Sequence, residues 1–255
     1  MHVISPYILQ SLKTLQKIDL DRDVLEPLIA KGLLYAYDSP EYVKDMGTPE
    51  RLEQVKLDIK TGKVKAKNLF YKQRAIFMDR DGTINQYIGF LKNIDAFALL
   101  DGVTSAIKKI NESGYLAIVV TNQPVIARGE VTIEQLEEIH QKMATLLGQQ
   151  GAYVDAIYYC PHHPHKGYKG EIPAYKMDCQ CRKPKPGMLF EAAKQYHIDL
   201  SSSWMVGDSI RDIQAGLAAG CQVAFIGKEN IANVKSFSNL LECVEEILAK
   251  GEKQK

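Results

Sequence analysis

One stretch of the sequence decides the fold, and it reads Arg74-Ala75-Ile76-Phe77-Met78-Asp79-Arg80-Asp81-Gly82-Thr83. Its first half is an apolar run with β-branched and aromatic residues, which is typical of a buried strand. Its second half places Asp79 and Asp81 two positions apart on extended backbone, so both side chains can face the same way. Two such carboxylates repel each other unless a cation or a shared proton relieves them, and oxygen-only ligands suit Mg²⁺. Taken alone, such a run is more often an acidic turn that caps a helix.

Downstream of this stretch, apolar strand-like runs alternate with helix-like segments. Further strands are predicted at 116–120, 156–159, 204–206 and 222–226, and helices at 104–113, 133–147, 188–196 and 213–219. Uninterrupted apolar strands that alternate with amphipathic helices predict an α/β fold, a doubly wound parallel sheet covered on both faces. In such sheets, ligands bind beyond the carboxyl ends of the strands.

Polar residues follow several of these predicted strands. Thr121 and Asn122 offer a hydroxyl, an amide and backbone N–H groups for phosphate oxygens, and Lys183 offers a cation in a proline-rich loop. Asp208 follows the strand at 204–206 and is a candidate metal ligand, with Asp212 four residues on. Each has a plainer explanation as a helix cap, a solvated basic loop or a charge at a helix amino terminus. Their coincidence at successive strand ends favours a phosphate-binding site.

The chain is predicted to hold two blocks, residues 1–68 and residues 69–255. A basic stretch at 60–67 predicts a solvated linker or an exposed turn between them. The first block shows strand-like runs at 2–4 and 33–37, a helix starting at 6–13 and a second helix at 49–59 capped by Thr48. A block of this size has a marginal core of its own, so we interpret it as a fragment.

Composition narrows the class of protein. The chain has 255 residues, a net charge of +1 and 25% charged residues, so no broad basic face predicts binding to nucleic acid or to an anionic membrane. No apolar run approaches the roughly 20 residues that span a bilayer, and the amino terminus does not resemble a secretory signal. We therefore expect a cytoplasmic enzyme.

Three of the five cysteines cluster between residues 160 and 181. An odd cysteine count without a signal argues against a disulfide framework. Cys160, Cys179 and Cys181, with one imidazole from His162, His163 or His165, make a Cys₃His set that is common in structural zinc sites. The plainer alternative is three reduced cysteines in a loop. Zinc here would order the loop that carries Lys183.

Residues from about 70 to 230 resemble the haloacid dehalogenase superfamily of phosphotransferases. The matching motifs are Asp79-x-Asp81-Gly82-Thr83, Thr121, Lys183 and Gly207-Asp208-x-x-x-Asp212. The resemblance implies that Asp79 is the nucleophile and forms an aspartyl-phosphate, while Asp81 protonates the leaving oxygen and then activates water. It also implies that Mg²⁺ is held by the Asp79 carboxylate, the Asp81 backbone carbonyl and Asp208, with Lys183 and Thr121 neutralising the phosphoryl charge.

Two segments, 158–164 and 178–188, resemble the heptose bisphosphate phosphatases and the related histidinol-phosphate phosphatases, as do 120–123 and 126–129. This resemblance implies that no large cap domain is present, and it assigns further residues by position. It implies zinc ligands Cys160, His162, Cys179 and Cys181, and substrate or phosphate contacts from Thr121, Asn122, Gln123, Arg128, Arg182 and Lys183. The sequence departs from the family at Ser209, where lysine is frequent, and at 124–125. The expected reaction is removal of the 7-phosphate of D-glycero-D-manno-heptose 1,7-bisphosphate; the alternatives are a histidinol-phosphate phosphatase and a non-catalytic remnant.

The first block resembles the carboxyl-terminal part of sugar-1-phosphate nucleotidyltransferases, through residues 2–6 and 42–51. The glycine-rich nucleotide loop of that family is missing, so we predict no transferase activity. The resemblance favours the α-anomer of the heptose, in a pathway that makes a nucleotide-activated sugar. We expect a sugar phosphate as the only partner and a monomer, with association possible through the first block. We also expect turnover to survive deletion of residues 1–68.

Overall fold

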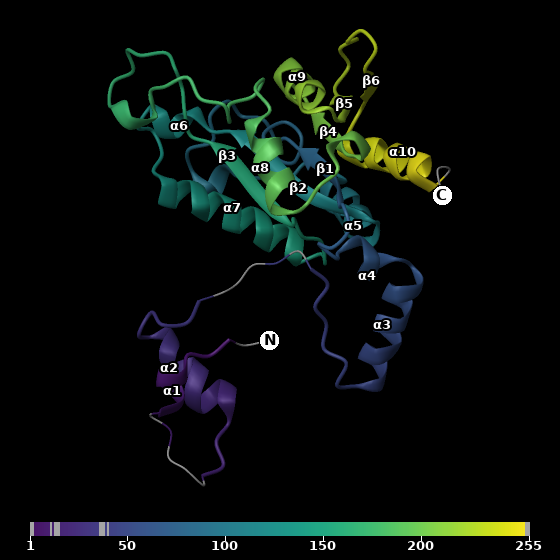
Figure 1. The fold of residues 1–255 in the computed structure, drawn as a ribbon. Helices are drawn as coiled ribbons and strands as arrows, with labels where there is room; N and C mark the ends of the chain where they lie inside the picture. The colour runs from purple at the N-terminus through teal and green to yellow at the C-terminus, as the bar shows by residue number, and fades with distance from the viewer. Residues whose placement is uncertain (1–2, 11, 13–15, 36–38, 40, 253–255) are drawn as a thin grey trace. The chain divides into compact units, whose positions relative to one another are not determined.

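A computed structural model describes residues 3–10, 12, 16–35, 39 and 41–252. The chain divides into two compact units, residues 1–39 and residues 40–255, which can be followed by colour in Figure 1. Position 2 and positions 36 and 37, which belong to the two strands predicted in the first block, lie outside the described residues.

The regular elements described in the first unit are all helical. It contains α1 (Pro6–Gln10), a π-helical turn η1 (Leu20–Leu25) and α2 (Glu26–Ile29). Residues 3–4 and 33–35 form no strand, so the predicted strands are wrong for these positions. A strand needs a paired neighbour for its backbone hydrogen bonds, and the described part of this unit offers none.

The second unit is built on a six-stranded parallel sheet with the order β3-β2-β1-β4-β5-β6. Its strands are β1 (Arg74–Met78), β2 (Tyr115–Asn122), β3 (Ala156–Cys160), β4 (Trp204–Gly207), β5 (Gln222–Ile226) and β6 (Lys235–Phe237). The first five confirm the predicted strands, and β6 is an additional short one. The last residue of β1, Met78, pairs with Val119 on one side and Val206 on the other, so β1 ends in the middle of the sheet. Asp79 therefore emerges at the centre of its carboxyl edge.

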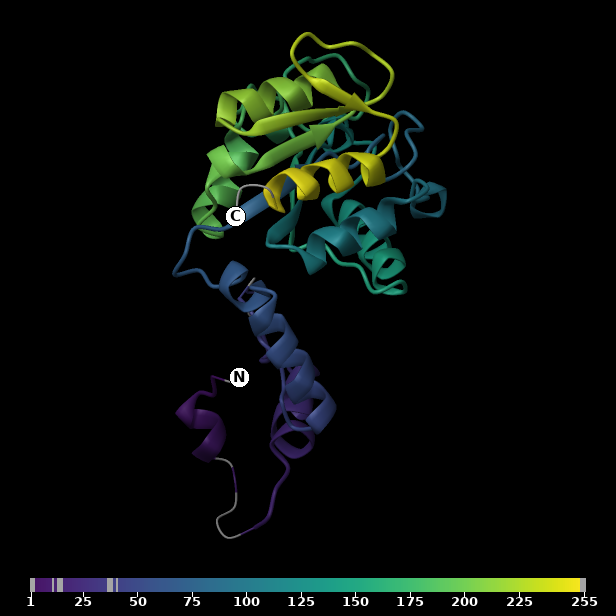
Figure 2. The ribbon, with the colours of Figure 1, turned by 90° about the vertical axis from the view of Figure 1, so that its right-hand side faces the viewer.

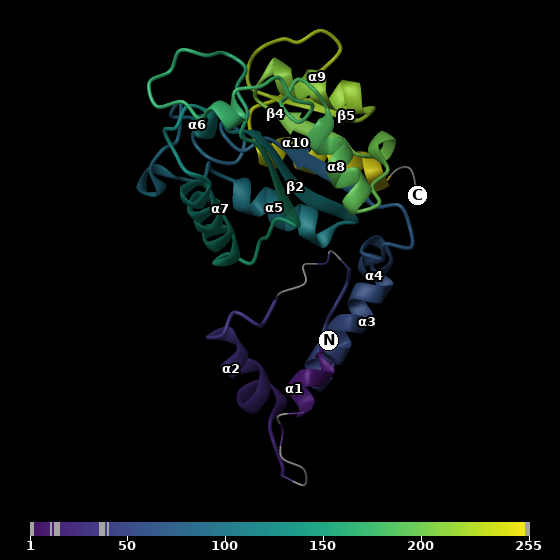
Figure 3. The same cartoon turned by 60° about the vertical axis from the view of Figure 1, so that its left-hand side comes forward.

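Helices cover both faces of the sheet, as predicted for a doubly wound fold. One face packs against α5 (Val103–Glu112), α7 (Ile133–Gly148) and α10 (Leu240–Glu252), and the other against α8 (Gly187–Gln195) and α9 (Ile210–Ala219). Figure 2 shows α9 and α10 on opposite sides of β5 and β6, and Figure 3 shows α8 beside α9. Alternate residues of β1 go to opposite cores, Ile76 and Met78 to the first and Ala75 and Phe77 to the second. Strict alternation explains why the whole strand is apolar.

The segment that precedes the sheet contains α3 (Pro49–Lys60) and the short α4 (Lys63–Ala66). The Thr48 side chain accepts a hydrogen bond from the Arg51 N–H, which confirms the predicted cap of α3. The predicted solvated linker at 60–67 is wrong at its end, because Lys67 is buried and its Nζ lies 2.8 Å from Asp155 Oδ1. Residue 155 directly precedes β3, so the segment is attached to the sheet at its amino-terminal edge.

The remaining elements are short. They are α6 (Pro124–Ala127) and the 3₁₀ turns η2 (Ile94–Ala96), η3 (Pro173–Tyr175) and η4 (Leu200–Ser202). Across the described ranges, none of the helices has the length and apolar character that a membrane span requires.

Candidate active site and zinc loop

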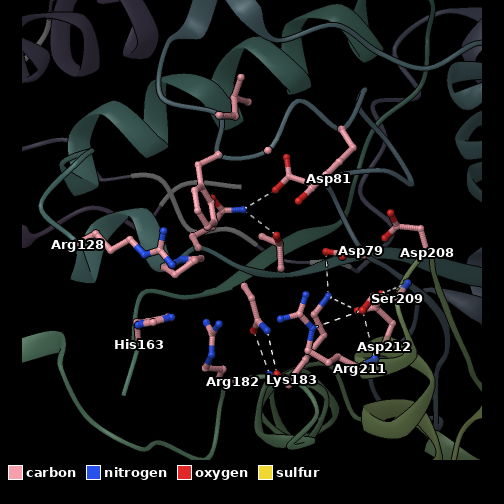
Figure 4. Close-up of a pocket in the computed structure, with 18 residues that line it drawn as sticks. Asp79, Asp81, Arg128, His163, Arg182, Lys183, Asp208, Ser209, Arg211 and Asp212 are labelled. Carbon is pink, nitrogen blue, oxygen red and sulfur yellow. Dashed lines mark hydrogen bonds and ion pairs between the residues drawn. The ribbon is translucent and has the colours of Figure 1, made fainter. Parts of the chain in front are cut away.

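A cavity of about 300 Å³ opens at the carboxyl edge of the sheet. Every residue predicted for catalysis, phosphate binding or magnesium lines it: Asp79, Asp81, Thr121, Asn122, Gln123, Arg128, Arg182, Lys183 and Asp208. In Figure 4, the acidic residues Asp79 and Asp208 lie on one side of the view and Arg128, His163 and Arg182 on the other. The cavity therefore has an acidic side and a cationic side.

Lys183 is fixed at the floor of the acidic side. Its Nζ lies 2.9 Å from Asp79 Oδ1, 2.6 Å from Asp212 Oδ1 and 2.7 Å from the Val120 carbonyl oxygen. These three acceptors use all three N–H groups of an ammonium ion. Burial works to lower the pKa of Lys183, but the charges of Asp79 and Asp212 raise it overall. Lys183 is therefore a permanent cation beside Asp79.

The two carboxyls predicted to hold magnesium resist ionisation when no cation is bound. Burial, and secondarily the charge of Asp212, raises the pKa of Asp79 to about 7, although Lys183 opposes the rise. Burial and Asp212 likewise raise the pKa of Asp208 to about 6. A divalent cation would remove this penalty by pairing with both carboxylates.

The structure also indicates which oxygens are available to that cation. Ligand oxygens of Asp79, Asp208 and Asp212 lie within 4.8 Å of one another. Both oxygens of Asp212 are already used, one by Lys183 and the other by the Ser209 N–H at 3.0 Å. Asp79 and Asp208 therefore remain as the side-chain ligands, and this all-oxygen set fits Mg²⁺.

Gly82 allows Asp208 to approach the loop that carries Asp79 and Asp81. A Cβ atom at position 82 would overlap Asp208 Oδ2, and the residue has φ +83°. Only glycine satisfies both conditions without strain. The missing side chain of Gly82 thus allows Asp208 to lie close to the loop that carries Asp79 and Asp81.

Asp81 is held by several donors. Its carboxylate accepts hydrogen bonds from Arg80, from Asn85 Nδ2 at 3.0 Å and from Gln123 Nε2 at 2.9 Å. The Gln123 amide also donates to Thr121 Oγ1 at 2.8 Å. The Gln123 side chain is therefore occupied with orienting its neighbours.

Asn122 has a similar internal role. Its side chain makes two hydrogen bonds to the backbone of Lys183, donating to the carbonyl at 2.9 Å and accepting from the N–H at 3.0 Å. Direct contact of Thr121, Asn122 and Gln123 with phosphate stays a prediction. The structure adds that Asn122 fixes the loop from which Lys183 enters the site.

The cationic side is organised around Arg128. Its guanidinium carbon lies 4.2 Å from the ring centre of Phe90 and 4.3 Å from that of Tyr168, so it is held between two aromatic faces. Arg182 donates from Nη1 to the His162 carbonyl at 3.0 Å. Burial lowers the pKa of Arg182, and the nearby charges of Arg211 and Arg128 lower it further. Positive charge is therefore concentrated here although the net charge of the chain is only +1.

The cysteine cluster forms beside this cationic side. Cys160 Sγ lies 3.5 Å from Cys179 Sγ and 3.2 Å from Cys181 Sγ, and His162 Nδ1 lies 3.3 Å from Cys181 Sγ. Tetrahedral zinc with Zn–S bonds of about 2.3 Å needs sulfurs about 3.8 Å apart, so these atoms need only small outward shifts to hold the ion. Hydrogen bonding to Cys160 lowers the pKa of Cys181 to about 5, which supplies the thiolate form that zinc requires.

Of the three histidines that the spacing left open, the structure places His162 in the cluster. His163 Nδ1 instead lies 3.2 Å from the His165 carbonyl oxygen. Because Arg182 donates a hydrogen bond to the His162 carbonyl, the cysteine cluster and the loop that carries Lys183 are directly connected.

Several cavity residues were missed by sequence reasoning. They are Tyr87, Phe90, Leu91, His163 and Arg211. Asp212 was part of the matched motif but had no role assigned to it, and the structure shows that it is the acidic partner of Lys183. The spacing of Asp212 from Asp208 was the one signal for its role. Ser209, which departs from the family pattern, caps α9. Its hydroxyl accepts a hydrogen bond from the Arg211 N–H, and its own N–H donates to the Asp212 side chain.

The fold and the site together define a magnesium-dependent phosphatase of the haloacid dehalogenase (HAD) class. A HAD-hydrolase-like family model matches residues 180–237. A crystal structure of D,D-heptose 1,7-bisphosphate phosphatase from B. bronchiseptica, complexed with magnesium and phosphate, is 33% identical with a TM-score of 0.61, and the match covers 70% of this chain and 99% of that chain. A HAD-like phosphatase structure from Mesorhizobium loti is 31% identical with a TM-score of 0.64, covering 71% of this chain and 87% of that chain.

A curated relative narrows the family. Over 145 residues the chain is 48% identical to D-glycero-beta-D-manno-heptose-1,7-bisphosphate 7-phosphatase from Salmonella typhi, and the match covers 57% of this chain and 75% of the relative. The chain belongs to the family of D-glycero-beta-D-manno-heptose-1,7-bisphosphate 7-phosphatases.

Proposed function

We propose that the chain removes the 7-phosphate of D-glycero-D-manno-heptose 1,7-bisphosphate, in the biosynthesis of a nucleotide-activated heptose. One observation carries the proposal beyond family membership: a single cavity has an acidic side around Asp79 and a separate cationic side around Arg128 and Arg182. A substrate with phosphates at both ends suits this division. One phosphate reacts at Asp79 while the other is bound by the arginines. The family name favours the β-anomer, against the α-anomer suggested by the first block.

The proposed chemistry follows from the contacts. An Asp79 oxygen attacks phosphorus, the bond from phosphorus to the sugar oxygen breaks, and the proton of the Asp81 carboxyl moves to that oxygen to release the sugar alcohol. Asp81 then takes a proton from the water that hydrolyses the aspartyl-phosphate, which yields inorganic phosphate and returns the starting protonation state. Lys183 holds Asp79 in place and offsets the phosphoryl charge. Magnesium bound to Asp79 and Asp208 would supply further charge neutralisation.

The assay compares phosphate release, with Mg²⁺, from both anomers of the heptose bisphosphate, from heptose 7-phosphate and from histidinol phosphate. Asp79→Asn serves as the blank. A preference for a bisphosphate anomer supports the proposal, and a preference for histidinol phosphate replaces it by the alternative activity. Failure to hydrolyse any of them favours the non-catalytic remnant.

A substitution on the cationic side tests the binding of the second phosphate in the same assay. Arg128→Ala should raise KM for the bisphosphate about tenfold to a hundredfold, because a charge-assisted hydrogen bond contributes about 1.5–3 kcal/mol. KM for heptose 7-phosphate should change little. Lys194→Ala, which removes an exposed charge from α8 outside the cavity, is the matched control. Equal KM changes for both substrates would contradict binding of a second phosphate at Arg128.

We also propose that residues 1–68 derive from the carboxyl-terminal part of a sugar-1-phosphate nucleotidyltransferase. The support is the resemblance of residues 42–51. In this segment Asp45 pairs with the Arg51 guanidinium and accepts from the Gly47 N–H at 2.9 Å, which are local contacts at the start of α3. Asp45 therefore acts as a turn residue, and incubation with sugar 1-phosphate and nucleoside triphosphates should give no transfer. Detectable transfer would contradict the predicted lack of transferase activity.

A cytoplasmic location and a monomeric state complete the proposal. The five cysteines are free thiols, and the zinc set needs three of them reduced, which suits a reducing compartment. Light scattering of the purified chain would test the monomeric state.

A further inference from the structure

Arg80 lies between the two aspartates of the site but does not face the cavity. Its side chain is fully buried, with 0% of the residue exposed. Nη2 donates to both carboxylate oxygens of Asp81, at 3.0 and 2.9 Å, and Nε lies 3.3 Å from Oδ1. A paired contact of this kind fixes the plane of a carboxylate as well as its position. Arg80 therefore acts on Asp81 from behind and has no access to substrate.

The other end of the guanidinium is held by a histidine from a distant helix. Arg80 Nη1 lies 3.2 Å from Nε2 of His140, which belongs to α7. Arginine has donors only, so Nε2 of His140 must be the acceptor and the ring proton must be on Nδ1. Burial, and then the charge of Arg80, lowers the pKa of His140 to about 3. His140 is therefore neutral near pH 7, as this bond requires.

His140 has no other evident reason to be polar. It is 8% exposed and lies on the buried face of α7 with Leu136, Ile139 and Met143. An apolar residue would normally occupy such a position, because a buried polar group costs free energy unless it is hydrogen-bonded. Among the described contacts, the hydrogen-bond partner of the ring is Arg80.

We propose that Arg80 and His140 are positioning residues for Asp81, with Arg80 orienting the carboxyl group and His140 holding Arg80. This inference rests on the proposed role of Asp81 as the group that protonates the leaving oxygen. Asn85 and Gln123 donate one bond each to Asp81, so they restrain single oxygens, whereas Arg80 contacts both. The core face of α7 is thereby linked to the proton-transfer step.

The link predicts an effect that depends on the leaving group. A sugar oxygen leaves as a strong base and needs the proton from Asp81, whereas p-nitrophenolate is stable without one. Asp81 also activates the water that hydrolyses the aspartyl-phosphate, and this step is common to both substrates, so the comparison uses kcat/KM, which reports only the steps up to departure of the leaving group. Loss of the acceptor at position 140 should therefore lower kcat/KM for a sugar phosphate far more than kcat/KM for p-nitrophenyl phosphate. A purely structural role would slow both substrates equally.

The test uses His140→Leu, His140→Gln and the control Met143→Leu, which changes the same buried face without touching Arg80. General acid catalysis contributes about 10²- to 10⁴-fold, so partial misorientation in His140→Leu should lower kcat/KM for the sugar phosphate about tenfold to a hundredfold. The kcat/KM for p-nitrophenyl phosphate should change less than about threefold. His140→Gln keeps an acceptor oxygen and should recover most of the loss, and Met143→Leu should resemble the wild type.

A second comparison covers the case in which His140→Leu folds poorly. Arg80→Lys keeps a buried cation but cannot make the paired contact to both oxygens, so it should lower kcat/KM for the sugar phosphate in the wild-type background and cause no further loss in an Asp81→Asn background, where the group being positioned no longer donates a proton. Equal losses on both substrates, full activity of His140→Leu, or an undiminished effect in the Asp81→Asn background would each overturn the inference. If the heptose bisphosphate is not a substrate, the same ratio measured with histidinol phosphate keeps this test separate from that of the proposed function.

Discussion

Replacing Lys67 by methionine should destabilise the fold strongly, although Lys67 lies far from the cavity at the opposite edge of the sheet. Its Nζ lies 2.8 Å from Asp155 Oδ1 and 2.8 Å from Tyr153 Oη. Burial works to lower the pKa of Lys67, but pairing with Asp155 raises it overall, so the lysine is charged. The second oxygen of Asp155 accepts the Ala117 N–H at 2.8 Å.

The structure sets the size of the effect. The side chains of Lys67 and Asp155 are 8% and 4% exposed. Removing one partner of a buried ion pair costs about 3–5 kcal/mol, because the remaining charge is left without compensation. For a chain of this length, 1 kcal/mol corresponds to about 2–4 °C in Tm. Lys67→Met should therefore lower Tm by about 6–20 °C.

Thermal unfolding followed by circular dichroism checks the prediction. Lys65→Met removes an exposed lysine from α4 and should shift Tm by less than about 2 °C, as expected for a surface charge. The double variant Lys67→Met/Asp155→Asn should be more stable than Lys67→Met, because the unpaired charge is gone. Turnover below the melting range should stay normal.

A Tm for Lys67→Met equal to that of Lys65→Met would refute the reasoning. Lys67 would then be solvated, as the sequence first suggested, and a domain boundary at 68/69 would be acceptable. The predicted result instead places Lys67 with the phosphatase domain. Deletion of residues 1–39 should then be harmless, whereas deletion of 1–68 should destabilise the remainder even if the folded fraction keeps its turnover.

Three further predictions concern the site. Magnesium affinity should rise with pH and level off above about 7, because Asp79 and Asp208 must lose protons whose pKa values are about 7 and about 6. Since these folded-state values exceed those of free aspartate, the two carboxyls stabilise the metal-free fold at low pH, and this stabilisation is lost as pH rises towards 7. Calorimetric titration of Mg²⁺ at several pH values checks the prediction, and an affinity that does not change with pH would contradict it. Elemental analysis should find one zinc per chain and much less in Cys181→Ser, and equal zinc in both would contradict the ligand set. Gly129→Ala should lower Tm and raise KM more than Gly170→Ala does. Both residues have positive φ, at which a side chain costs about 1–2 kcal/mol, but only a Cβ at position 129 would overlap the carbonyl oxygen of residue 170. Equal effects of the two substitutions would show that this contact is unimportant.

The sequence was sufficient for five of the six strands of the sheet and for half of the residues that line the cavity. Strands such as 116–120 are continuous apolar runs, and only a strand covered on both faces has that composition. Residues that follow such strands converge because parallel strands end at one edge, which brought Asp79, Thr121 and Asp208 together without further information. The prediction of strands at 3–4 and 33–35 was wrong, because local composition cannot show whether a partner strand is present.

The rest depended on contacts between distant parts of the chain. Lys67 belongs to a lysine-rich run that reads as solvated, and only the position of Asp155 makes it a core residue. His140 contacts Arg80 across 60 residues, and its spacing on α7 is that of an apolar position. The stacking of Tyr168 on Arg128 joins a loop to a helix end, and neither segment carries a periodic signal that predicts it.

The cysteine cluster has a consequence for how this enzyme can diversify. The predicted zinc ligands lie at the two stems of one long loop, His162 before it and Cys179 after it, and the second stem continues directly into Arg182 and Lys183. With zinc bound, residues 163–178 between the stems would be able to change in length and composition while Lys183 stays where it is. Tyr168, which lies in that interval and stacks on Arg128, is part of the cationic wall of the cavity. Zinc bound by the cluster would thus separate two tasks that a simple loop would couple, so that selection could alter which phosphate ester is accepted without changing the residues predicted to cleave it.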